Sequence, residues 1–364
     1  MAKNEQKKVL LIGAGKIGSM IAHMLSSNDY NITVADMSSE SLAHEKLKTF
    51  KRTVLNVFNA NELTKILKDH DYVINAGPYF LAEPIATAAS ATTTHYFDLT
   101  EDVKQTEIIK RIAAKNRTKC VFVPQSGLAP GFIAIVANDL AKKFDTVEDV
   151  KMRVGALPRF PNNSLKYNMT WNTDGLINEY LHSCNAVQNG KLVTVKALEG
   201  LESFSLDGEP YEAFNTSGGL GTLCETWKGK VRNMDYKTIR YPGHRYLMKF
   251  LIDEMKLGDD EGKLLKKLMD KAVPSTEQDV VVIFVSVTGY KNDRLVQETW
   301  SKKIYGQEMF GHSWTAIQLT TGASVCAIIE LHQTKKILQK GFVKQESANL
   351  EDFLATKCGD IYNG

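Results

Sequence analysis

The sequence predicts an α/β protein in which a Rossmann-type, doubly wound parallel sheet precedes an α+β substrate and dimerisation domain with a mostly antiparallel sheet. Three observations support this prediction. Short apolar segments of strand type alternate with helix-type segments over roughly the first 130 residues. A glycine motif stands between the first strand-type segment and the first helix-type segment. From about residue 149 onward, strand-type segments such as "VKMRVGAL" and "DVVVIFVSVTGY" prevail.

The glycine motif is the most specific signal in the chain. The apolar run Val9–Ile12 is followed by "GAGKIG", with Gly13, Gly15 and Gly18 in G-x-G-x-x-G spacing. In such a motif the first glycine makes a tight turn, the second lets the backbone approach a pyrophosphate, and the third lets helix and strand pack closely. The second strand-type segment, "NITVAD", ends in Asp36, which is placed to bind the adenosine ribose and to repel a 2′-phosphate. We therefore expect NAD rather than NADP. The other loop residues are Ala14, Lys16 and Ile17.

The alternation continues with the strand-type segments "RTVLNVFN", "DYVINAGPY", "HYFDLT" and "KCVFVPQ", each separated from the next by a helix-type segment. Ligands of doubly wound sheets bind beyond the carboxyl ends of the strands. The residues at the ends of two of these strands are therefore expected to line the cofactor crevice. They are Ala76, Gly77, Pro78, Tyr79 and Asp98.

The domain organisation follows from the change of pattern. We expect an NAD(P)-binding domain over residues 1–130, a substrate-binding and oligomerisation domain over 131–312, and a C-terminal helical segment over 313–364 that packs back on the first domain. The second domain is expected to contain a strand at "SLKYNMTWN" and helices at "GLINEYLHSC" and "GHRYLMKFLIDEM". The segment "VVVIFVSV" is apolar at successive positions and needs cover on both faces. We therefore expect a homo-oligomer, most simply a dimer.

The composition excludes several classes of function. The formal net charge of +3 gives little support to a nucleic-acid or membrane-surface partner. The five cysteines are scattered without a pair at metal-ligand spacing, so neither a metal site nor a disulfide framework is expected. No stretch approaches the roughly 18 uninterrupted apolar residues of a membrane span. The expected compartment is the cytoplasm, and the expected partner is a small molecule.

The motifs together resemble the saccharopine dehydrogenase-like family, and within it the lysine 6-dehydrogenase type. The resemblance covers nearly the whole chain through "GAGKIG", "VINAGPYF", "HYFDL", "GLAPGF", "VGALP", "TDGLINEY", "EAFNTSGG" and "YKTIRYPGH". It implies oxidation of a C–N bond with hydride transfer to NAD(P), a Rossmann domain, and an α+β substrate domain that also forms the subunit interface.

The chain departs from the family pattern at three positions. The resemblance implies an acid where Ala129 stands, a cysteine where Val154 stands, and a substrate-binding arginine near Thr216. Loss of an acid and an arginine from a site for a bulky dicarboxylate favours a smaller amine, so the expected reaction is oxidative deamination of the ε-amine of L-lysine to the semialdehyde. The alternatives are saccharopine oxidation or another amine-linked reaction of this family, and a non-catalytic NAD-binding sensor.

The stretch "YKTIRYPGH" supplies the first candidate site residues. An α-carboxylate requires a cation, for which Arg240 is the candidate, and a neutral ε-amine requires a base or an apolar pocket. His244 is the candidate for a general base or an orienting donor. The structural alternatives are a salt bridge of Arg240 that fixes the turn, and a helix-terminal His244 bonded to the backbone.

Four other residues are candidates, of which Glu179 and Glu225 are the weaker two. Tyr79 matches the tyrosine of the family's "PY" motif and is expected either to hydrogen-bond the amine or the nicotinamide amide, or to pack. Asp98 is expected near the nicotinamide ribose. Glu179 and Glu225 could pair with an ammonium group, although both also suit a helix surface.

Overall fold

The computed structural model describes residues 6–115 and 119–363, and these divide into two compact units. The first unit comprises residues up to Ile135 together with Phe310–His312 and Gln318–Gly364. The second comprises Val136–Met309 and Ser313–Ile317. Most of the C-terminal segment therefore belongs to the same unit as the glycine motif. None of the helices in the described ranges combines the length and the apolar character that a membrane crossing requires.

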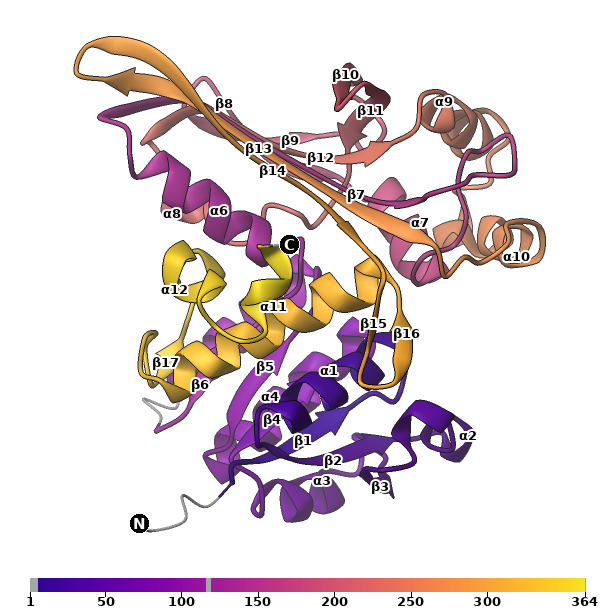
Figure 1. Cartoon of the computed structure of the whole chain (residues 1–364), viewed down its shortest axis with the longest axis vertical. Coiled ribbons are helices and arrows are strands. Elements are labelled where there is room, and N and C mark those ends of the chain that lie inside the picture. Colours follow the sequence, from indigo (N-terminus) through magenta and orange to yellow (C-terminus); the bar gives the residue numbers. More distant parts are fainter. Residues whose placement is uncertain (1–5, 116–118, 364) are drawn as a thin grey trace. The chain divides into compact units, whose positions relative to one another are not determined.

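The first unit is built on a seven-stranded parallel sheet (Figure 1). Its strand order, β17-β6-β5-β4-β1-β2-β3, reverses direction beside β1, as in a doubly wound fold. This confirms the expected fold class of the first domain. The strands are β1 (Lys8–Ile12), β2 (Asn31–Asp36), β3 (Lys51–Val54), β4 (Tyr72–Asn75), β5 (His95–Asp98), β6 (Val121–Val123) and β17 (Gly341–Phe342).

Helices of the first unit bury an apolar face against this sheet. Leu10 of β1, Val73 of β4 and Phe122 of β6 share one fully buried core with Ile85 and Ile109, which come from two of the helices. Long α11 approaches α1 closely, because a Cβ placed at Gly322 would lie 3.1 Å from the Met20 side chain. The helices are α1 (Lys16–Ser27), α2 (Ser39–Leu42), α3 (Ala60–Leu67), α4 (Ala82–Thr92), α5 (Val103–Lys115) and α12 (Leu350–Leu354), with parts of α6 (Phe132–Ala141) and α11 (Ala316–Gln333).

The second unit is built on a mixed sheet of order β10-β11-β12-β7-β13-β14, with β8 and β9 attached to β12. Only the β7–β12 pair is parallel, so the sheet is mostly antiparallel and the expected class of the second domain is also confirmed. The long strands β13 and β14 are drawn in orange in Figure 1. The strands are β7 (Thr146–Pro158), β8 (Cys184–Gln188), β9 (Lys191–Val195), β10 (Glu202–Leu206), β11 (Glu209–Asn215), β12 (Val231–Arg240), β13 (Asp279–Lys291) and β14 (Arg294–Tyr305).

The two faces of this second sheet bury different sets of side chains. Phe214 of β11 joins a core with helix residues such as Leu176, Met248 and Leu265. Ile239 of β12 lies on the opposite face, in a smaller core. The helices are α7 (Thr173–Leu181), α8 (Leu223–Thr226), α9 (His244–Lys249) and α10 (Lys263–Ala272).

Two segments differ from their expected secondary structure. Residues 164–172 form no strand, because Lys166 has a φ of 49° and the Asn163 side chain bonds to the backbone of Tyr167. The C-terminal helix α11 begins only at Ala316, where the Asp279 carboxylate accepts its first N–H groups, from Ala316 at 2.5 Å and Ile317 at 3.0 Å. The residues just before it form β16 (His312–Trp314), which pairs with β15 (Gln307–Met309).

Strand β13 also bears on the dimer prediction. Its apolar residues Val280–Ile283, Val285 and Val287 are all buried within the single chain. The chain itself therefore buries the apolar residues on both faces of this strand. The homodimer stays a prediction, and the apolar character of β13 no longer supports it.

Candidate active site: a nucleotide loop and a buried arginine

The glycine loop of the first unit has the close contacts that its spacing predicts. Gly13 has a φ of 115°, and a Cβ there would lie 2.8 Å from the backbone of Ala76. A Cβ on Gly18 would lie 1.9 Å from the Gly13 carbonyl oxygen, so helix α1 can approach β1 only with glycine at this position. Gly15, in contrast, is exposed and faces open space, with no atom within 4 Å of a Cβ built on it. Its backbone is thus accessible to a pyrophosphate at the start of α1, beside the exposed Lys16 and half-buried Ile17.

Asp36 ends β2 next to this loop and holds it in place. One carboxylate oxygen accepts the Ala14 N–H at 2.8 Å, and the other accepts the Ser38 N–H at 2.8 Å. The carboxylate therefore bridges the glycine loop and the turn into α2. Because the side chain remains partly exposed, its charge also faces any group bound beside the loop.

The end of β4 forms the next part of this edge. Ala76 donates its N–H to Ile12 at 2.8 Å, and Gly77 donates to the Asn75 side chain at 3.1 Å. Pro78 then leads into a 3-10 turn at Tyr79–Leu81. The Tyr79 side chain is half-exposed and packs edge-on against Phe80, with ring centroids 5.9 Å apart. It is accessible to a ligand, as its predicted role requires.

Asp98 is at the end of β5, but the chain encloses it completely. Its carboxylate accepts hydrogen bonds from Tyr96 Oη at 2.6 Å, Thr100 N at 3.0 Å and Gln125 N at 2.9 Å. Burial raises the pKa of Asp98 to about 6, against the effect of these three donors. The geometry supports positioning of the loops that carry Thr100 and Gln125, whereas contact with a nicotinamide ribose stays a prediction.

Arg240 ends β12 in the second unit and is only 2% exposed. Its Nε donates to Tyr180 Oη at 2.9 Å, while Nη1 donates to Thr238 Oγ1 at 3.2 Å and to the Ile239 carbonyl at 2.8 Å. The Tyr167 ring lies under the guanidinium, 5.0 Å from its centre. Among the residues that the structure describes, none accepts a hydrogen bond from Nη2, and no carboxylate there is ion-paired with Arg240.

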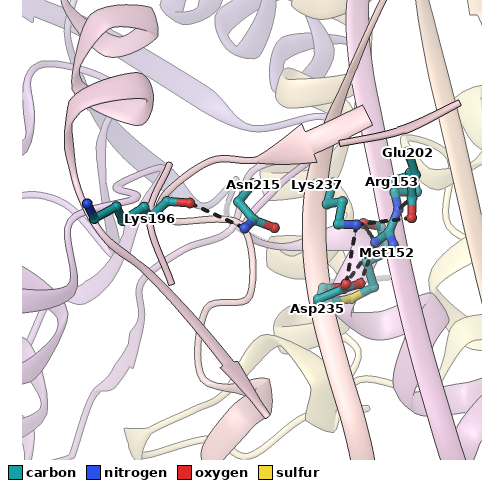
Figure 2. Close-up of polar contacts among 7 residues, drawn as sticks. All are labelled: Met152, Arg153, Lys196, Glu202, Asn215, Asp235 and Lys237. Carbon is teal, nitrogen blue, oxygen red and sulfur yellow. Dashed lines mark hydrogen bonds and ion pairs between the residues drawn. The ribbon is translucent and has the colours of Figure 1, made fainter. Parts of the chain in front are cut away.

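A second buried arginine in the same sheet differs from Arg240 because carboxylates of the chain form ion pairs with it. Arg153 of β7 is 1% exposed and forms ion pairs with Glu202 and with Asp235, the latter at 2.6 Å. Lys237 joins them through Glu202 at 3.0 Å, so two positive charges face two negative ones (Figure 2). Arg153 and Arg240 lie on opposite faces of the sheet. The charges around Arg153 balance one another, whereas no described carboxylate forms an ion pair with Arg240, although Glu179 favours its charged form.

His244 is fully buried at the start of α9, and both ring nitrogens are bonded. Nδ1 lies 2.9 Å from the Leu165 carbonyl oxygen and Nε2 lies 3.0 Å from Tyr180 Oη. Burial and, to a smaller extent, the Arg240 charge lower the pKa of His244 to about 3. A neutral imidazole with both nitrogens engaged supports the orienting role considered for this residue and gives little support to proton acceptance from a substrate.

The other predicted and missed residues are placed as follows. Glu179 lies near enough to Arg240 to influence its charge. Burial lowers the pKa of Arg240, but Tyr180, Tyr167 and Glu179 together raise it by more, so this pKa lies above its ordinary value. Glu225 is exposed in α8. Sequence reasoning missed Tyr180, although "TDGLINEY" contains it, because its contact with Arg240 spans 60 positions.

The parallel sheet of the first unit, with its glycine loop and the acidic end of β2, has the features of an NAD(P)-binding domain. Comparisons with known proteins agree with this class. Residues 9–122 match the saccharopine dehydrogenase NADP binding domain, and residues 127–356 match the saccharopine dehydrogenase C-terminal domain. The chain belongs to the saccharopine dehydrogenase family.

Individual relatives are distant. The saccharopine dehydrogenase [NADP(+), L-glutamate-forming] of Saccharomyces cerevisiae is 25% identical over 72% of this chain and 61% of its own length. The mitochondrial alpha-aminoadipic semialdehyde synthase of Bos taurus is 23% identical over 84% of this chain, which spans 34% of that longer protein. In structure, the apo saccharopine dehydrogenase (L-Glu forming) from Saccharomyces cerevisiae superimposes with a TM-score of 0.80, 18% identity and 98% coverage of both chains. The resemblance seen in the sequence is thus confirmed at the level of the family. Two of these three relatives are named saccharopine dehydrogenases, and none of the three is named a lysine 6-dehydrogenase.

Proposed function

We propose that this chain is an NAD-dependent oxidoreductase that removes hydride from the carbon of a C–N bond in an amino acid whose carboxylate binds Arg240. The observation that carries the proposal is the buried guanidinium of Arg240, which forms no ion pair with a carboxylate of the described chain. A buried cation of this kind is stabilised when a carboxylate binds it. Bound nicotinamide would supply the hydride acceptor, and the residues of the chain supply position and charge.

Two substrates are supported by different observations. The family match and the relatives named as saccharopine dehydrogenases support saccharopine, a secondary amine. L-Lysine is supported by the charges of the second unit, because the nearby buried cations Arg153 and Lys237 are already neutralised by Glu202 and Asp235. Arg240 then remains to hold one carboxylate, which fits an amino acid with a single carboxylate better than one with several.

The cofactor is proposed to be NAD, although the names of the family domain and of the yeast relative contain NADP. The support is Asp36, which ends β2 and binds the glycine loop, so that its charge would oppose a 2′-phosphate on a ribose bound there.

A single set of assays tests the proposed reaction, the proposed substrates and the proposed cofactor. The purified protein is incubated with L-saccharopine or L-lysine and with NAD⁺ or NADP⁺, and formation of reduced nicotinamide is followed by absorbance. We expect turnover of one of the two amino acids, with NAD⁺ preferred. Saturable cofactor binding without turnover of either substrate, or of related diamines, would instead support a cofactor-binding sensor.

A further inference from the structure

Tyr180 occupies the centre of a buried hydrogen-bonded chain in the second unit. It lies in α7, and its hydroxyl is 2.9 Å from Arg240 Nε and 3.0 Å from His244 Nε2. The other ring nitrogen of His244 is 2.9 Å from the Leu165 carbonyl oxygen. Four residues from separate segments are thus joined in one line.

The chemistry of these groups sets the direction of every hydrogen bond. A guanidinium can only donate and a carbonyl oxygen can only accept. Tyr180 Oη must therefore accept from Arg240 Nε, and His244 Nδ1–H must donate to Leu165. The single hydroxyl proton of Tyr180 is left for the lone pair on His244 Nε2. Neutral His244 in its Nδ1–H form is the state that satisfies both ends of this line.

These contacts engage most of the N–H donors of the Arg240 guanidinium. Nε is bonded to Tyr180, and the two N–H groups of Nη1 face Thr238 Oγ1 and the Ile239 carbonyl. Thr238 is itself oriented, because its hydroxyl donates to the Val154 carbonyl at 3.3 Å. Of the five guanidinium N–H groups, only the two on Nη2 have no acceptor among the described residues.

We infer that Tyr180 and His244 are positioning residues, which hold Arg240 so that Nη2 alone presents its two N–H groups to the carboxylate of the substrate. This inference rests on the proposed function and adds a mode of recognition. The site offers a single-nitrogen contact, since the two-nitrogen fork that arginine usually presents to carboxylates is blocked at both Nε and Nη1.

The kinetic test replaces Tyr180 with Phe, which retains the ring and removes the hydroxyl. We expect the KM for the amino acid to rise about five- to twentyfold while kcat stays within about twofold, because the released guanidinium loses its fixed orientation. The matched control is Tyr241→Phe. It removes a partly buried hydroxyl that donates to the Pro158 carbonyl at 3.0 Å, on the other face of the sheet. That variant should leave both constants unchanged.

A double-mutant cycle shows whether Tyr180 acts through Arg240. In an Arg240→Gln background the Tyr180→Phe change should alter KM by less than about twofold, because the group it positions is gone. Fully multiplicative effects, or an unchanged KM in a folded Tyr180→Phe single variant, would overturn the inference. Circular dichroism of each variant identifies those that fail to fold.

Histidine ¹⁵N NMR tests the hydrogen-bonded line independently of activity. One imidazole should remain in the Nδ1–H form from pH 7 to about pH 5, its signals should vanish in His244→Gln, and Tyr180→Phe should shift its Nε2 resonance. If this signature is found but neither L-lysine nor L-saccharopine turns over, the proposed substrates are wrong and the positioning stands. If turnover is normal and the Nδ1–H signature is missing, the positioning is wrong and the proposed function stands.

Discussion

Replacement of Asp36 is the most informative test of cofactor choice, because this carboxylate has two separable roles. It binds the N–H groups of Ala14 and Ser38, each at 2.8 Å, and it carries a negative charge beside the glycine loop. Asp36→Ser removes both roles. Asp36→Asn removes the charge but retains one carbonyl oxygen that can still accept one of the two N–H groups.

The magnitudes follow from these two roles. Unit charges about 4 Å apart repel by about 1 kcal/mol in bulk water and about 4 kcal/mol at an effective dielectric constant of 20. For a partly exposed Asp36 beside a 2′-phosphate, we expect a repulsion of about 1.5–3 kcal/mol, which corresponds to roughly a ten- to a hundredfold change in the relative use of NADP. Hydrogen bonds to charged groups contribute about 1.5–3 kcal/mol each, and water can replace part of this at an accessible site. Asp36→Ser should therefore also lower the free energy of unfolding by about 1–3 kcal/mol.

The assay compares kcat/KM for NAD⁺ and NADP⁺ in wild-type protein and in both Asp36 variants, together with urea unfolding. The matched control is Glu40→Gln, which removes one negative charge from the exposed first turn of α2. Both Asp36 variants should shift specificity towards NADP, and Asp36→Ser should lose at least as much stability as Asp36→Asn. The reasoning is refuted if the wild-type protein uses NADP⁺ as well as NAD⁺, or if the Asp36 variants shift specificity no more than the control.

Three further predictions concern other parts of the chain. Arg240→Lys should raise the KM for the amino acid about ten- to a hundredfold and leave the KM for the cofactor unchanged, as measured by steady-state kinetics. The reason is that a lysine ammonium cannot donate to Tyr180, Thr238 and a ligand together. Burial lowers the pKa of His332 to about 4, so stability is fully present above pH 6.5 and is lost as the pH falls towards 4, by about 2 kcal/mol at pH 5. His332→Gln should flatten this part of the pH–stability curve in urea unfolding. We also propose a homodimer, and a monomer mass in light scattering at working concentration would contradict it.

The fold could be predicted from the sequence because its signals are local. The order of Val9–Ile12, the glycine motif and Asp36 lies within one β-α-β unit, and Gly13 and Gly18 each allow a close contact within that unit or with the adjacent strand. The close approaches at Gly13 and Gly18, and the open space at Gly15, follow from that order alone. The same local reasoning was wrong for residues 164–172, where side-chain bonds from Asn163 compete with strand pairing.

The environments of the site residues could not be predicted in the same way. Strand alternation placed Asp98 at the end of β5, but its enclosure depends on Gln125, 27 positions later. His244 was considered as a base because it follows a turn, whereas its low pKa comes from burial and from Arg240. Tyr180 carried no signal, because a tyrosine in an amphipathic helix usually packs in a core.

The contrast between two buried arginines gives the strongest physical reason to assign function to the second unit. Arg153 shares its face of the sheet with Lys237, Glu202 and Asp235, so its charge is balanced within the chain, although its Nη2 has no hydrogen-bond partner among the described residues. Arg240 is buried as deeply, yet its hydrogen-bond partners among the described residues are two hydroxyls and a carbonyl, and Glu179 favours its charged form without forming an ion pair with it. A carboxylate bound at Nη2 would add the ion pair that Arg153 already has within the chain. This difference between the two arginines is the reason that the proposed function assigns the substrate carboxylate to Arg240 and not to Arg153.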